Sequence, residues 1–97
     1  MIDKSSIPDM ERFMELPQHS KFIIMRLSKL GKTQVWLARE CGCSAQHINN
    51  ILVGRALPSL KLMCRICATL NMEVLVVFKE VFEDAGLSEL EKFSGAK

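Results

Sequence analysis

Residues 33–59 read TQVWLARECGCSAQHINNILVGRALPS, and this stretch decides the fold. In its first part Leu37, Ala38 and Cys41 recur at helical spacing, which predicts a helix with these side chains on its inner face. Thr33 is a suitable N-cap, because its hydroxyl oxygen can accept a hydrogen bond from one of the free N–H groups of the first turn. A first short helix is therefore expected to end at Cys41.

A tight turn and a second short helix are expected next. Gly42 directly follows the last apolar residue, where glycine commonly ends a helix in the left-handed conformation. Ser44 can then cap a helix over residues 45–52, AQHINNIL. Beyond its first residue, the apolar side chains of this helix lie at i, i+3 and i+4: Ile48, Ile51 and Leu52.

The other side chains of residues 45–52 are polar and are expected to project outward: Gln46, His47, Asn49 and Asn50. Two helices joined by a three-residue turn form a helix-turn-helix, whose second helix places its outer face in the major groove of DNA. Gln and Asn side chains suit this role, since each presents a donor and an acceptor to N6 and N7 of adenine. At the helix N-terminus, Ser44 can approach a phosphate together with free backbone N–H groups.

The chain before residue 33 predicts two further helices. Residues 5–16, SSIPDMERFMEL, can begin at the N-cap Ser6 and are followed by the helix breaker Pro17. Residues 19–31, HSKFIIMRLSKLG, predict a longer helix, because apolar side chains recur at helical spacing, including Phe22, Met25 and Leu30. His19 precedes this helix and is expected at the surface.

After residue 59 the pattern stays helical and then changes. Residues 59–71 predict a helix capped by Ser59, with these side chains inward: Leu60, Met63, Ile66, Cys67 and Leu70. Residues 72–79, MEVLVVFK, are rich in valine and alternate, which predicts a β-strand. A lone strand leaves its backbone groups unpaired, so the same strand of a second subunit is the simplest partner. Ser88 with Glu91 forms a capping box, which predicts a last short helix.

These patterns predict a mainly α fold with three parts. Residues 1–19 form an N-terminal arm with a short helix, residues 20–71 a helix-turn-helix domain of a four- to five-helix bundle, and residues 72–97 a strand and short tail for dimerisation. The length of 97 residues suits one domain, and a dimer would add buried surface.

Charge is distributed unevenly along the chain. Residues 1–19 have a net charge of −2, residues 20–65 of +7, and residues 66–97 of −3. A basic middle predicts a face that binds a polyanion, although the same charges also suit an ordinary solvated surface. No export signal and no apolar run of about 18 residues is visible, so a cytoplasmic protein without a membrane segment is expected.

Residues 20–71 resemble the Cro/C1-type (Xre) helix-turn-helix family, whose members are lambda-repressor-like bundles. The positions that match the family pattern in register are Thr33, Gln34, Leu37, Ala38, Gly42, Ser44, Ile48, Gly54, Pro58, Ser59, Ile66 and Leu70. This resemblance implies a DNA-binding transcriptional regulator. A strand after the fourth helix would also resemble the arrangement in the antitoxin-repressors of toxin–antitoxin operons. Some of those proteins dimerise through a small sheet between subunits.

The resemblance implies roles for individual side chains. The positions that match base-reading residues are Ala45, Gln46 and Asn50, while Asn49 matches a position that reaches bases or phosphate. The positions that match contacts to the DNA backbone are Gln34, Ser44, His47 and Arg55. Departures from the family pattern are Trp36, Asn49, Leu52, Val53, Met63 and Cys67, and they leave the base preference open. Trp36 is either a surface anchor for a partner or packs against the N-terminal helix.

The cysteines and His47 are candidates for other kinds of site. The cysteines of C-x-C and C-x-x-C could together hold zinc or act as redox sensors, but Cys41 and Cys67 fall where the family buries small apolar residues. Among the four cysteines, Cys43 and Cys64 are expected to be more exposed. His47 could serve as a metal ligand or pH switch, but beside Gln46 and Asn50 it suits a DNA contact better. No catalytic constellation is visible, so neither an enzyme nor a cofactor or metal is expected.

The sequence therefore predicts a sequence-specific, repressor-like regulator that binds a palindromic operator on double-stranded DNA as a homodimer. The alternative is a protein-interaction module, such as an antitoxin, that uses the strand, Trp36 and the acidic ends to bind a toxin or other partner, with DNA binding secondary.

Overall fold

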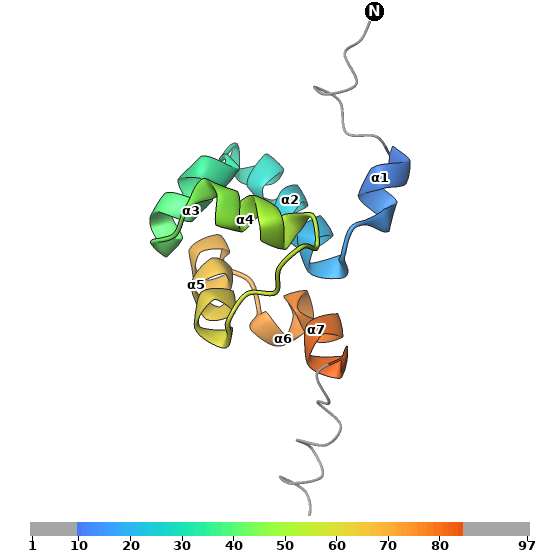
Figure 1. Ribbon diagram of the computed structural model, residues 1–97. Coiled ribbons are helices and arrows are strands. Elements are labelled where there is room, and N and C mark those ends of the chain that lie inside the picture. Colours follow the sequence, from blue (N-terminus) through green and yellow to red (C-terminus); the bar gives the residue numbers. More distant parts are fainter. Residues whose placement is uncertain (1–9, 85–97) are drawn as a thin grey trace, which may run out of the picture.

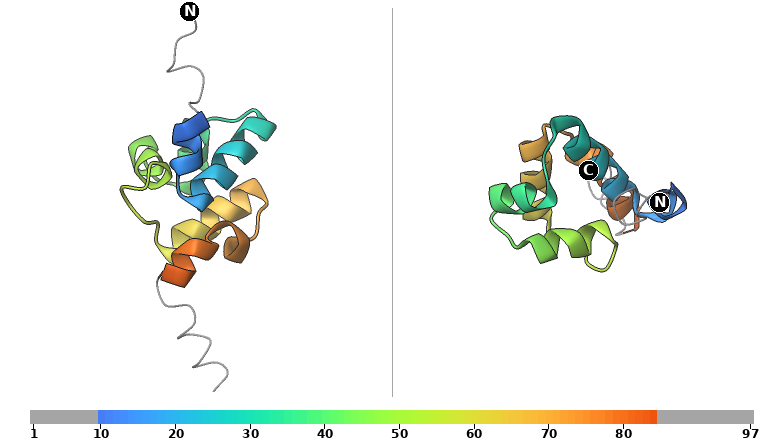
Figure 2. Two further views of the ribbon diagram at one scale, coloured as in Figure 1. Left: turned by 90° about the vertical axis from the view of Figure 1, so that its right-hand side faces the viewer. Right: turned by 90° about the horizontal axis from the view of Figure 1, so that it is seen from above.

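The computed structural model describes residues 10–84, and this part of the chain consists of helices and their connections (Figure 1). In chain order the helices are α1 (Met10–Glu15), α2 (Gln18–Leu30), α3 (Gln34–Cys41), α4 (Ala45–Leu52), α5 (Leu60–Leu70), α6 (Val74–Val77) and α7 (Lys79–Asp84). Figure 2 shows α2, α3, α4 and α5 around a common centre, with α1 at one side. None of the helices between residues 10 and 84 has the length and apolar character that crossing a lipid bilayer requires.

The predicted N-caps of three helices are confirmed. Each hydroxyl oxygen accepts a hydrogen bond from the backbone N–H three residues later: Thr33 from Trp36 at 3.0 Å, Ser44 from His47 at 3.0 Å, and Ser59 from Leu62 at 3.1 Å. Such a cap stabilises a helix by about 0.5–2 kcal/mol. Gly42 ends α3 with a φ of 75°, a left-handed conformation that strains a residue with a Cβ. The lengths of α3, the turn and α4 are therefore fixed by local interactions.

The inner faces predicted for α3 and α4 are confirmed as well. Their buried side chains are Leu37, Ala38, Cys41, Ile48, Ile51 and Leu52. Helix α3 packs against both α4 and α5, and α2 contributes Ile23 and Leu27 to the same core. Burying a leucine or isoleucine side chain stabilises the fold by about 1.5–3 kcal/mol, so this core holds the two helices at a fixed angle.

The buried face of α2 differs from the apolar face that the sequence predicts. Ile23 and Leu27 are buried, whereas Met25 is 62% exposed. His19, predicted at the surface, is also buried and stacks on the ring of Phe78 at a centroid distance of 5.1 Å. Helix α2 carries apolar side chains on more than one face, so its neighbours in the fold decide which face is covered.

One inward position predicted for α5 is also wrong. Leu60 is 60% exposed, and Leu62 is buried in its place, beside Met63. Leu60 is the first residue of α5, at the flank of its buried face. It therefore lies beyond the end of the core.

The predicted strand over residues 72–79 is wrong, because this segment forms α6 and the start of α7. Val77 and Phe78 donate backbone hydrogen bonds to Glu73 and Val74, both at 2.9 Å, which is helical pairing. Val77 and Phe78 are buried side by side against α2 and α5, whereas Leu75 is 64% exposed. Strand propensity is readily overridden by such packing, since a helix can bury adjacent residues together and a strand alternates them.

The chain ends carry two further expectations. Pro17 separates α1 from α2, as predicted. The proposed cap Ser6 and the capping box of Ser88 and Glu91 lie outside the described residues.

Candidate nucleic-acid interface

Helix α4 is held at both of its ends and along its inner face. Ser44 caps its first turn, and α2 reaches its last turn with two polar side chains. Ser20 donates its hydroxyl to the carbonyl oxygen of Leu52 at 2.6 Å, and the Nε2 atom of His19 lies 3.2 Å from the carbonyl oxygen of Ile51. The last carbonyls of a helix have no partner within the helix. The chain itself caps α4 at Gly54, whose φ is 86° and whose N–H donates to the carbonyl of Ile51 at 3.2 Å. The two bonds from α2 add to this cap and hold the C-terminal end of α4 to the rest of the fold.

The outer face of α4 carries a hydrogen-bonded pair of amides. Gln46 is exposed and donates from Nε2 to Oδ1 of Asn50 at 3.1 Å. The two residues are four positions apart, so they are neighbours on the helix surface. The pair leaves Oε1 and one N–H of Gln46 for another partner, because the amide group has two donors. Ala45, also predicted to read bases, is half-buried against the edge of the core.

A second amide pair joins α4 to the start of α3. Asn49 is half-buried, and its Nδ2 atom donates a long hydrogen bond of 3.5 Å to Oε1 of Gln34. The fold thus brings together one residue predicted to read bases and one predicted to contact the DNA backbone. Their contact also ties the two helices of the helix-turn-helix to each other.

The remaining predicted backbone contacts lie at the two ends of α4. The Ser44 oxygen accepts the His47 N–H, so this N–H is not one of the free N–H groups expected to meet a phosphate beside Ser44. The Ser44 hydroxyl hydrogen can still be donated to a phosphate, because the cap uses only the oxygen. Arg55 is exposed after α4, and its backbone N–H donates to the carbonyl of Asn50 at 2.8 Å. This bond holds the base of the Arg55 side chain close to the amide pair.

Two cationic side chains of the basic middle have structural roles that the sequence did not indicate. Arg65 donates from Nη1 to the carbonyl of Cys41 at 3.2 Å, and Arg26 donates from Nε to the carbonyl of Leu70 at 2.9 Å. Each guanidinium thus satisfies the end of a helix. Both side chains keep their positive charge, but these bonds hold them at the ends of α5 and α3. His19 and Ser20 were also missed, since only the folded chain places them at the end of α4.

Trp36, left open by the sequence, is half-buried at the edge of the core. The Nζ atom of Lys32 lies 5.2 Å from the centroid of its ring, a cation–π contact. Trp36 is therefore partly covered by the chain's own residues.

The cysteines differ in burial, and none of the described groups forms a metal cluster. Burial raises the pKa of the Cys67 thiol to about 11 and also raises the pKa of Cys41, so both are protonated near neutral pH. Cys43 is half-buried and Cys64 is exposed, as predicted. Between residues 10 and 84, no group of three or more His, Cys, Asp or Glu side chains is placed to hold a metal ion.

Comparison with known proteins agrees with this geometry. Residues 24–76 match the model of a family described as helix-turn-helix, a span from α2 to α6 that covers more than half of the chain. Searches of curated proteins and of solved structures gave no match. The matched span contains α3, the turn at Gly42, and α4 with its outward amides. The chain therefore belongs to the Cro/C1-type (Xre) helix-turn-helix family of DNA-binding transcription regulators.

Proposed function

We propose that the chain acts in the cytoplasm as a sequence-specific, repressor-like regulator that binds a palindromic operator as a homodimer. The observation that carries this proposal is the outer face of α4, where Gln46 donates to Asn50 at 3.1 Å on a helix held at both ends. A rigid helix with amides of defined orientation is what reading base edges in the major groove requires.

Gln46 is the principal base reader in this proposal. Its free Oε1 and remaining N–H can bind N6 and N7 of one adenine together, and each such pair contributes about 1–3 kcal/mol of discrimination. Asn50 orients the Gln46 amide and presents its own Nδ2 to a neighbouring base. Ala45 and Asn49 complete the reading surface, Ala45 through apolar contact with a thymine methyl group.

Contacts to the DNA backbone supply the part of the affinity that does not depend on sequence. Gln34, Ser44, His47 and Arg55 lie at the start of α3, at the first turn of α4 and after its last turn. Bound phosphates release counterions, so affinity is expected to fall steeply as salt is raised.

Residues 72–97 supply the dimer contact in this proposal, through α6 rather than a strand. Leu75 is 64% and Val76 52% exposed on α6, and adjacent exposed apolar side chains favour a protein contact. Two subunits related by a twofold axis would place their α4 helices about 34 Å apart, one turn of DNA.

Selection of bound sequences from a random pool of double-stranded DNA tests the function. An enriched palindrome with half-sites one helical turn apart is expected. Enrichment of a single half-site would refute the dimer alone, and no enrichment would refute sequence-specific binding.

The second candidate is an antitoxin that binds a toxin. Its proposed strand is replaced by α6, and Trp36 is half-buried beside Lys32. The exposed pair Leu75 and Val76 is the observation that still favours it. A small toxin encoded by a neighbouring gene and copurifying with the chain would support this candidate; the lack of such a neighbour would count against it.

A further inference from the structure

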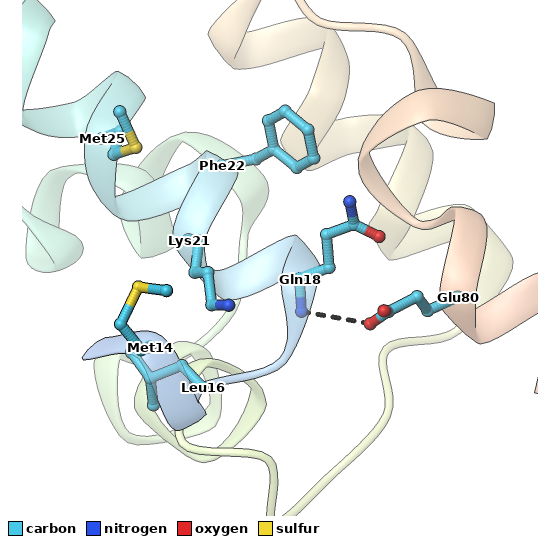
Figure 3. Close-up of a pocket in the computed structure, with 7 residues that line it drawn as sticks. All are labelled: Met14, Leu16, Gln18, Lys21, Phe22, Met25 and Glu80. Carbon is cyan, nitrogen blue, oxygen red and sulfur yellow. Dashed lines mark hydrogen bonds between the residues drawn. The ribbon is translucent and has the colours of Figure 1, made fainter. Parts of the chain in front are cut away.

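A groove on the outer face of α2 lies outside the proposed DNA-binding surface. It consists of two adjoining hollows, of about 510 Å³ and 360 Å³, that share Phe22 and Met25 as lining residues. Figure 3 shows the larger hollow, with Met14 and Leu16 from the side of α1 and Glu80 from α7. We call both hollows together the α2 groove.

The floor of the α2 groove is apolar and open to solvent. Met14 and Met25 are each 62% exposed, Phe22 is 36% exposed, and Met72 at the other end is half-buried. Clustered exposed apolar side chains mark interaction sites. Methionine is flexible and polarisable, so it adapts to the shape of an incoming side chain and is common at peptide-binding surfaces.

The charged lining residues of the α2 groove are mostly cationic. Lys21, Arg26 and Lys29 line it, against one carboxylate, Glu80. The Glu80 carboxylate accepts a hydrogen bond from the backbone N–H of Gln18 at 3.3 Å, so it is partly engaged within the fold. The net positive lining favours a partner that carries carboxylates beside its apolar side chains.

The length of the groove suits a helix better than a small molecule. Its lining residues run along α2 from Gln18 to Lys29, which is about 16 Å at 1.5 Å per residue, or three helical turns. An amphipathic helix lying in an apolar groove presents anchors at i, i+3, i+4 and i+7 over a similar length.

The charge of the groove favours a different protein over a second copy of the chain. A helix turns about 100° per residue, so Phe22, Met25 and Lys29 lie on the side of α2 away from the buried Ile23 and Leu27. The groove therefore faces away from α4. In a twofold dimer joined through the groove, the same net positive lining would meet itself, which disfavours a second copy as the occupant.

We propose that the α2 groove docks an acidic amphipathic helix of a partner protein. The apolar side chains of that helix would lie on Phe22, Met25 and Met72, and its carboxylates would pair with Lys21 and Lys29. The docked helix would leave the outer face of α4 free, so the partner and DNA could be bound together.

The test is selection of displayed random peptides of about 16 residues, enough for three turns, on the full chain. Enriched peptides should be acidic, with apolar residues at helical spacing. The synthesised consensus peptide should bind the Met25→Glu and Lys29→Glu variants about tenfold more weakly than it binds the unchanged chain. Its binding to the unchanged chain should also weaken as the salt concentration rises. Leu60→Glu is the matched control, because Leu60 is 60% exposed, close to the 62% of Met25, and lies outside both the groove and the proposed dimer contact.

Several outcomes would overturn the proposal. They are no enrichment, a neutral or basic consensus, or equal weakening of peptide binding by Leu60→Glu. Sedimentation velocity identifies the other occupant: if Met25→Glu turns a dimer into a monomer and Leu75→Glu does not, the groove holds a second copy. Met25 and Lys29 are exposed, so the Met25→Glu and Lys29→Glu variants should match the unchanged chain in circular dichroism and in DNA binding.

Discussion

Replacing Ser20 with alanine is expected to destabilise the fold by about 1–3 kcal/mol, mainly through the end of α4. The Ser20 side chain is fully buried, and its hydroxyl donates to the carbonyl oxygen of Leu52 at 2.6 Å. The substitution removes one oxygen and leaves this carbonyl without the partner that α2 supplies. A buried acceptor left unpaired costs about 1–3 kcal/mol, more than the net value of a typical hydrogen bond.

Urea unfolding of the full chain measures this loss, and Ser28→Ala is the matched control. Ser28 lies on the same helix but is exposed, so its replacement reports the higher helix propensity of alanine, about 0.5 kcal/mol at most. The difference between the two variants isolates the hydrogen bond to α4. In a domain of this size, each kcal/mol should lower the melting temperature by about 4–8 °C. If Ser20→Ala is as stable as Ser28→Ala, α2 does not hold the end of α4 by this bond.

Three further predictions concern the interface and its support. Asn50→Ala should reduce binding to the selected operator more than binding to unrelated DNA, because it removes the orientation of Gln46; equal losses in gel-shift titrations would contradict base reading. Arg55→Ala should weaken binding to the operator and binding to unrelated DNA alike. A loss of binding confined to the operator would rule out a phosphate contact. Burial lowers the pKa of His19 below 6.5, opposed in part by its bond to Ile51 and by Glu80. As pH falls, His19 therefore takes up a proton in the unfolded chain before it does so in the folded chain. The free energy of unfolding should be highest above about pH 7 and should decrease as the pH falls through about 6. His19→Gln should flatten this decline, and an unchanged slope would assign it to other groups.

Features fixed by neighbouring residues could be predicted from the sequence. The caps at Thr33, Ser44 and Ser59 and the turn at Gly42 depend on a hydroxyl or a missing Cβ within three or four positions. The sequence therefore predicts correctly where α3 and α4 begin and end. The same local logic identified Ile48 and Ile51 as the inner face of α4, because the polar residues between them leave no other apolar stripe.

Features decided by distant packing could not be predicted in this way. Helix α2 has apolar side chains around most of its surface. Whether Ile23 or Met25 is buried therefore depends on where neighbouring helices such as α4 and α6 pack against it. The valines of α6 favour a strand locally, but the adjacent Val77 and Phe78 are both buried, with Phe78 stacked on His19. A helix can bury two such neighbours on one side, whereas a strand directs them to opposite faces. The outward amides were found from residue type, but their pairing was not, since the bond between Asn49 and Gln34 spans two helices.

Helix α2 separates two surfaces that can change independently. Its inner side supplies His19 and Ser20 to the last carbonyls of α4, so substitutions there are expected to act on DNA binding through the position of α4. Its outer side supplies Phe22 and Met25 to the groove, and neither of these side chains belongs to the buried core. The two sets are adjacent in sequence and opposite in space, because each residue turns the helix by about 100°. Substitutions of these outer side chains are therefore expected to cost little stability and to leave α4 in place.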